Sequence, residues 1–143
     1  MKFVIGEKQW RRKMNKSPSG SLCPYYYMGG ELHPLHYGSC FNNKKELFAI
    51  IKAEEDFIIA SSGFNNRRIW IDLYETVIDN EVADILVDHL KAIRHKILKL
   101  CLVGCSSKDK EKIKLKMKQQ NMDLSGQTQY FSDPEEAKQW LIY

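Results

Sequence analysis

The segment "WIDLYETVIDNEVADILVDHL" (residues 70–90) decides how the rest of the sequence is interpreted. It begins in an apolar run typical of a buried strand and passes through an acidic turn. Apolar residues then recur at spacings of three and four, which predicts an amphipathic helix over residues 80–96. Asp72, Asp79 and Asn80 surround the junction, where many enzymes of this architecture place a phosphate-binding loop or a nucleophile. The question is what acidic and amide side chains do there.

Size and composition predict one compact domain over residues 1–143. A chain of 143 residues with 43% apolar and 28% charged residues can bury roughly two-thirds of its unfolded surface. Apolar runs are too short to cross a bilayer, and residues 1–13 become charged too early for a signal peptide, so we expect a cytoplasmic protein with free thiols. The net charge of +4, concentrated in residues 2–16 and 108–118, favours anionic partners only slightly.

Apolar periodicity and turn residues predict alternating strands and helices. Strands are expected at residues 2–14, 24–32, 67–73, 97–105 and 127–131. Helices are expected at residues 44–62, 80–96, 106–121 and 132–141, with N-caps at Asn42 or Asn43, at Ser106 or Ser107, and at Ser132. Two stretches are ambiguous: residues 56–62 could equally form a short strand, and residues 106–121 alternate like one. For the second stretch, the crossover needed between parallel strands favours a helix.

The predicted order is strand, strand, helix, strand, helix, strand, helix, strand, helix. Such alternation predicts an α/β protein with a single mixed, mostly parallel sheet, covered by helices through right-handed crossovers. The first two strands are expected to be antiparallel across the loop of residues 15–21. Residues 33–43 are expected to be irregular because they contain Pro34 and Gly38.

Three short motifs occur in the order and spacing of a known family. They are Gly30-Glu31-Leu32, then Asp72-Leu73-Tyr74 followed by Ile78-Asp79-Asn80-Glu81-Val82, and finally "YFSDPEEAKQWL" at residues 130–141. Similar motifs mark the second strand, the central strand with its following helix, and the last strand and helix of the STAS domain. The chain therefore resembles the STAS domain of bacterial anti-sigma-factor antagonists and of the cytoplasmic tails of sulfate transporters. The resemblance covers most of the chain and implies the same order of elements.

The resemblance implies a non-enzymatic regulatory module that binds a protein partner, such as an anti-sigma-factor kinase or another regulatory protein. In antagonists a serine after the aspartate accepts phosphate, but Asn80 stands there and has no hydroxyl. The plain interpretation of Asp79 and Asn80 is N-capping, worth about 1 kcal/mol. The sharper hypothesis is constitutive partner docking on an acidic helix start. Its contact residues are Asp79, Asn80, Glu81, Asp84 and Asp88.

An alternative function is a small-ligand sensor that binds a nucleotide or a lipid near the start of the second helix. Asp72, Asn80 and Cys105 would line its pocket. Cys101 and Cys105 are expected to pack in the core, although a helix N-terminus near Cys105 could lower the pKa of its thiol. Neither GxGxxG nor GxxxxGK[ST] occurs in the chain. No nucleophile with its base can be assembled from the spacing, so an enzyme is the last choice and no cofactor is expected.

Two further constellations have plainer explanations. Cys23, His33, His36 and Cys40 have the spacing C-x9-H-x2-H-x3-C, which offers four zinc ligands but lacks the short CxxC of common zinc modules. Buried thiols and loop histidines explain these residues equally well. A stacking platform for single-stranded nucleic acid could be built from two clusters, but strand tyrosines usually pack. These clusters are Tyr25, Tyr26 and Tyr27, and Trp10, Arg11 and Arg12.

Overall fold

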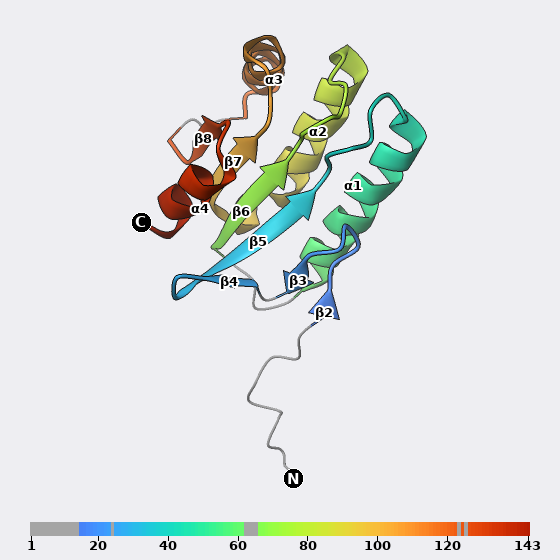
Figure 1. The fold of residues 1–143 in the computed structure, drawn as a ribbon. Helices are drawn as coiled ribbons and strands as arrows, with labels where there is room; N and C mark the ends of the chain where they lie inside the picture. The colour runs from blue at the N-terminus through green and yellow to red at the C-terminus, as the bar shows by residue number, and fades with distance from the viewer. Residues whose placement is uncertain (1–14, 24, 62–65, 123, 125) are drawn as a thin grey trace.

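A computed structural model describes residues 15–23, 25–61, 66–122, 124 and 126–143 of the protein (Figure 1). These residues form an α/β fold with one mixed, mostly parallel five-stranded sheet and four α-helices. The predicted fold class is therefore confirmed. The first predicted strand, residues 2–14, lies outside the described residues.

Neighbours in sequence are neighbours in space throughout the sheet. Its strands, in spatial order, are β4 (Tyr25–Tyr27), β5 (Gly30–His36), β6 (Arg67–Asp72), β7 (Ile97–Val103) and β8 (Thr128–Phe131). β5 to β8 are parallel, and β4 is antiparallel to β5. A separate ribbon pairs β2 (Asn15–Lys16) with β3 (Leu22–Cys23). Because the strand order never reverses in the described sheet, it has no switch-point crevice of the kind in which doubly wound folds bind ligands.

The helices divide between the two faces of the sheet (Figure 1). One face is covered by α1 (Lys44–Ala60), α2 (Asn80–Ile93) and α3 (Ser107–Gln119), and the other by α4 (Pro134–Ile142). A 3-10 turn, η1 (Arg94–Lys96), links α2 to β7. Among the described residues, no helix has the length and apolar character required to span a bilayer.

Hydrophobic cores lie on both faces of the sheet. The larger one, beneath α1 to α3, takes Leu100 and Leu102 from β7. The smaller one, beneath α4, takes Cys101 and Val103 from the same strand, as the period of two side chains in a strand requires. The predicted apolar stripe of α2 is confirmed, since its buried residues are Val82, Ala83, Leu86, Val87, His89, Leu90 and Ile93.

Side-chain caps fix where the helices begin. Asn43, Asp79 and Ser106 accept backbone N–H groups at the starts of α1, α2 and α3, in agreement with the sequence. The predicted cap at Ser132 is wrong, because the carboxylate of Asp133 accepts the N–H of Glu135 at 3.0 Å. α1 remains helical to residue 60, so the alternative of a strand beginning at residue 56 is also wrong.

The sequence prediction fails over residues 24–43. Instead of one strand and an irregular stretch, the chain forms a β4–β5 hairpin, and β5 continues to His36. Met28 and Gly29 have φ of 48° and 84°, the pair of positive values that a tight type I′ turn needs. Pro34 fits within β5 because its backbone faces the loop that contains Ser21. The Ser21 hydroxyl donates to the Pro34 carbonyl at 2.6 Å. Among the described residues, no strand pairs with β5 on the side where the N–H that proline lacks would point.

A buried carboxylate holds this loop against the edge of β5. Glu54 of α1 is fully buried and accepts the Ser17 hydroxyl at 2.7 Å, the Ser19 N–H at 2.9 Å and the Ser19 hydroxyl. Ser19 Oγ in turn accepts the N–H of His36 at 3.0 Å. The imidazole of His33 lies 3.8 Å from Glu54. One acidic side chain thus joins α1, the loop and β5.

Replacing Glu54 by alanine is expected to lower the free energy of unfolding by about 3 kcal/mol, because the buried hydroxyls and His33 lose their charged partner. Urea denaturation followed by circular dichroism measures the change. Asp56→Ala is the matched control, since it removes an exposed carboxylate from the same helix and should have little effect. Equal losses in the two variants would contradict the role given to Glu54.

Candidate docking site

The loops that follow β5 and β6 run side by side at the carboxyl edge of the sheet. Figure 1 shows these strand ends pointing to the same edge. Four backbone hydrogen bonds join the loops beyond the last sheet pairing: Tyr37 N to Asp72 O (3.0 Å), Ser39 N to Tyr74 O (2.6 Å), Phe41 N to Glu75 O (2.8 Å) and Val77 N to Phe41 O (2.7 Å). The loops therefore form one short, ordered extension of the β5–β6 pair.

Thr76 fixes the two loops from the inside. Its buried hydroxyl donates to the carbonyl of Tyr37 at 2.7 Å and accepts the N–H of Cys40 at 3.2 Å. Ser39 adds an outer bond from its hydroxyl to the Glu75 carboxylate at 3.0 Å. Both loops are thus held by side chains as well as by backbone.

Two large apolar side chains stand in solvent where the loops meet. Phe41 is 59% exposed and Val77 is 54% exposed. The backbone at Ser39, Phe41 and Glu75 has φ of 61°, 50° and 56°. For residues other than glycine this left-handed conformation costs roughly 1–2 kcal/mol each. Strain of this kind clusters at functional sites, and here it presents an aromatic ring to water.

Charged residues at the start of α2 adjoin this apolar pair. The Asp79 carboxylate accepts the N–H of Val82 at 2.9 Å, which confirms N-capping by this residue. Lys44 lies 2.6 Å from Asp79 and 2.8 Å from Glu81, so it joins the starts of α1 and α2. We call six residues the rim surface: the exposed Phe41, Val77, Asn80 and Glu81 and the half-buried Lys44 and Asp79.

The other two predicted contact residues lie further along α2 and face α3. Asp84 forms an ion pair with Lys116 at 3.1 Å. Asp88 accepts the side-chain amide of Gln120 at 2.8 Å. The acidic side chains of α2 are therefore engaged by Lys44 at the helix start and by α3 further along. Asn80 is exposed at the helix start as the first helical residue.

The surroundings of Asp72, one of the alternative ligand residues, are closely packed. Asp72 accepts the N–H of Tyr74 at 3.0 Å and lies 3.8 Å from His36. Gly38 packs so closely that a Cβ there would stand 2.8 Å from the Asp72 carboxylate. The Tyr74 ring packs equally closely on Gly104 at the end of β7. A cavity of about 760 Å³ occurs elsewhere, between α3 and β8, and none of Asp72, Asn80 and Cys105 lines it.

Cys105 packs against the core, as expected, and the alternative of a lowered thiol pKa is wrong. Burial, with a smaller contribution from Asp109, raises the pKa of the Cys105 thiol to about 12. The residue precedes the cap of α3, but its side chain packs against the larger core and not in solvent at the helix N-terminus. At neutral pH it is a protonated core thiol.

The four possible zinc ligands are not brought together. His33 lies beneath α1 beside Glu54, whereas His36 lies on the opposite face of β5 against Trp70. Cys23 and Cys40 are buried. Within the described ranges, no three histidine, cysteine or acidic side chains are grouped closely enough to hold a metal ion.

The tyrosines proposed as a stacking platform pack against α4. Tyr25 and Tyr27 surround the ammonium group of Lys138, whose Nζ lies 5.8 Å and 5.3 Å from their ring centroids. Tyr26 points outward, as strand alternation allows. Two of the three rings are thus occupied by an internal cation. Trp10, Arg11 and Arg12 lie outside the described residues.

Sequence reasoning missed a buried chain of hydrogen bonds. The Tyr37 hydroxyl lies 2.7 Å from Nε2 of His89, and Nδ1 of His89 lies 3.0 Å from the Glu55 carboxylate. Burial lowers the pKa of His89, which Glu55 partly opposes. Tyr37 and His89 are buried, so a substrate in solvent cannot reach these two side chains. Only the tertiary packing of α1, α2 and β5 could reveal it.

Comparisons with known proteins add no relative to this picture. No family model matches the chain, and no match was found among curated proteins or solved structures. The geometry described above and the short motifs of the sequence therefore carry the functional argument.

The cap at Asp79 predicts a pH-dependent contribution to stability. Asp79→Ala is expected to lower the free energy of unfolding by about 1 kcal/mol at pH 7. Lys44, followed by the N–H of Val82, lowers the pKa of Asp79 below its ordinary 3.8. The charged cap is thus complete above that value and is lost as the pH falls through the lowered pKa. Denaturant unfolding of the unmodified protein and of Asp79→Ala between pH 7 and pH 2 measures the difference in their free energies of unfolding.

Two neighbouring variants control for this prediction. Asn80→Ala changes an exposed residue in the same turn and should alter stability by less than about 0.5 kcal/mol. Asp79→Asn keeps an acceptor oxygen but loses the charge, so it should remove most of the pH dependence while retaining part of the cap. A pH-independent loss in Asp79→Ala would contradict the assignment.

Proposed function

We propose that this protein is a non-enzymatic regulatory module, resembling a STAS-type anti-sigma-factor antagonist, that binds a protein partner through the rim surface. The sequence of described elements from β4 to α4 supports the proposal, because it alternates as that family resemblance implies. The observation that carries it is the exposed pair Phe41 and Val77, held by paired, strained loops beside the start of α2.

The chemistry of the rim surface suits a protein better than a small polar substrate. Apolar side chains surrounded by charged groups are typical of interaction patches, in which an aromatic anchor contributes much of the affinity. Lys44, Asp79 and Glu81 supply a polar border with both signs of charge. The ordered loops would also bind with little loss of conformational entropy.

Binding through this surface would not be regulated by phosphorylation of residue 80. The residue is exposed at the positive end of α2, where a phosphate would be electrostatically favoured, but its amide cannot be phosphorylated. Control would have to act through the partner or another part of the chain. Asp84 and Asp88 extend the proposed contact surface along α2, with weaker contributions expected because α3 already engages them.

A double variant, Phe41→Asn with Val77→Ser, tests the proposal. Asparagine tolerates positive φ, so the fold should be retained while the apolar anchor is lost. Tagged protein is expressed in its native cells, and captured proteins are quantified by mass spectrometry. We expect at least a tenfold loss of a specific partner, and a kinase-type anti-sigma factor as that partner would support the antagonist role.

The matched control is Ile59→Ser with Leu115→Ser, which removes two exposed apolar side chains from α1 and α3. This variant should capture the same partner as the unmodified protein. Circular dichroism of each variant checks that the fold is intact. A folded rim variant that captures every partner at the level of the control variant would overturn the proposal.

A further inference from the structure

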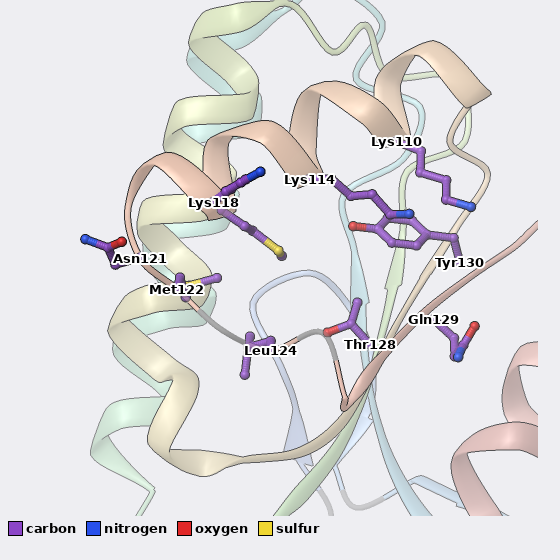
Figure 2. A pocket seen from close by; sticks show the side chains of 10 residues that line it. Lys110, Lys114, Lys118, Asn121, Met122, Leu124, Thr128, Gln129 and Tyr130 are labelled. Carbon is purple, nitrogen blue, oxygen red and sulfur yellow. The ribbon is translucent and has the colours of Figure 1, made fainter.

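The cavity of about 760 Å³ lies between α3 and the edge strand β8, away from the rim surface. Figure 2 shows Lys110, Lys114 and Lys118 projecting from α3, with Thr128 and Tyr130 on β8 facing them. Its volume is within the range of roughly 300–1,000 Å³ typical of sites for single small molecules.

Lys110, Lys114 and Lys118 form a cationic wall on one side of the cavity. They recur every four residues, so they share one side of α3. None of them has a carboxylate partner in the part of the chain that the structure describes. Lys112 and Lys116, on the neighbouring side of the helix, are both engaged: Lys112 donates to the carbonyl of Ile78 at 3.0 Å, and Lys116 pairs with Asp84. The five lysines from residue 110 to residue 118 thus divide into a tied pair and three untied side chains that line the cavity.

The Tyr130 ring lies against this wall. The Nζ atoms of Lys110 and Lys114 lie 5.2 Å and 5.7 Å from its centroid. Burial raises the pKa of the Tyr130 hydroxyl, which therefore stays protonated and can donate. The ring thus holds the ammonium groups of Lys110 and Lys114 near the cavity, and its hydroxyl is a hydrogen-bond donor.

Two buried hydroxyls at the cavity are unsatisfied. Thr128 Oγ1 and Tyr130 Oη are both shielded from solvent and have no hydrogen-bond partner among the described residues. Buried polar atoms are nearly always paired, so such exceptions need an explanation. Neither oxygen is exposed to the cavity, so a ligand with acceptor oxygens would satisfy both groups once the lining side chains shift aside.

The remaining lining is apolar. Met117, Met122 and Leu124 are buried and contribute to the larger core. Methionine side chains adapt to ligands of varied shape. The cavity therefore presents cationic and hydroxyl groups on one part of its lining and a hydrocarbon surface on another.

We propose that this cavity binds a small amphipathic anion, with a carboxylate or phosphate head at the lysines and the two hydroxyls and an apolar body against Met117, Met122 and Leu124. The site is independent of the rim surface, so either assignment can fail alone. It also differs in place from the pocket that the sequence suggested near the start of α2.

Isothermal titration calorimetry on the full chain tests the proposal with four probes. Octyl phosphate and octanoate carry both head and tail, 1-octanol has only the tail, and inorganic phosphate has only the head. We expect one-to-one binding of at least one amphiphilic anion, at least tenfold tighter than 1-octanol or phosphate. The tighter of the two anions identifies the head group as phosphate or carboxylate.

Variants locate the binding. Lys110, Lys114 and Lys118 changed together to glutamine should weaken binding at least tenfold. The matched triple change of Lys16, Lys45 and Lys91, which are exposed elsewhere, removes the same charge and should alter affinity less than twofold. Tyr130→Phe should weaken binding severalfold without lowering the melting temperature of the free protein, because it removes an unsatisfied buried hydroxyl.

Three results would overturn the proposal. For the third of these results, adenosine monophosphate is titrated in the same way as a fifth probe. The results are absence of binding by both amphiphilic anions, equal losses of affinity in the two lysine variants, and binding of adenosine monophosphate as tight as that of the best amphiphile. The last result would indicate a nucleotide site, in which the apolar body is not required.

Discussion

The parallel pairing of β6 between β5 and β7 is the constraint on which the rest of the structure depends. Its register places Asp72 opposite His36 on one side and Val103 on the other, so three strands end at one level. The chain leaves β5 and β6 in the same direction, and backbone pairing continues as far as Val77. The rim surface is therefore a consequence of the sheet register, and the side chains of Thr76 and Ser39 hold its loops in place.

Periodicity predicted the elements whose environment is simple. β7 is buried on both faces from Leu100 to Val103, β6 buries Ile69 and Ile71 on one face, and α2 buries one face against the sheet. Asp79 could be predicted as an N-cap because it is a short side chain with an acceptor oxygen, directly before a segment whose apolar residues recur at helical spacing. The candidate site was anticipated in part: the start of α2 was located from the sequence, but the apolar anchor Phe41 beside it was not.

The missed features depend on contacts between distant residues. Pro34 suggested an irregular segment, yet the serine-rich loop and Glu54 make its position in β5 acceptable. Likewise, the lysines of α3 have the same sequence character throughout. Only the positions of Ile78 and Asp84, on other elements, separate the engaged lysines from those that line the cavity. No local pattern records such differences.

Site-specific photo-crosslinking tests the central claim, that the rim surface is where this protein meets its partner, most directly. A benzophenone amino acid placed at Phe41 keeps an aromatic side chain in the exposed position, and the same label at exposed Ile59 gives the background. On irradiation of native cells, we predict a discrete protein adduct from position 41 that position 59 does not give. A folded protein whose position 41 yields no adduct above that background would contradict the account.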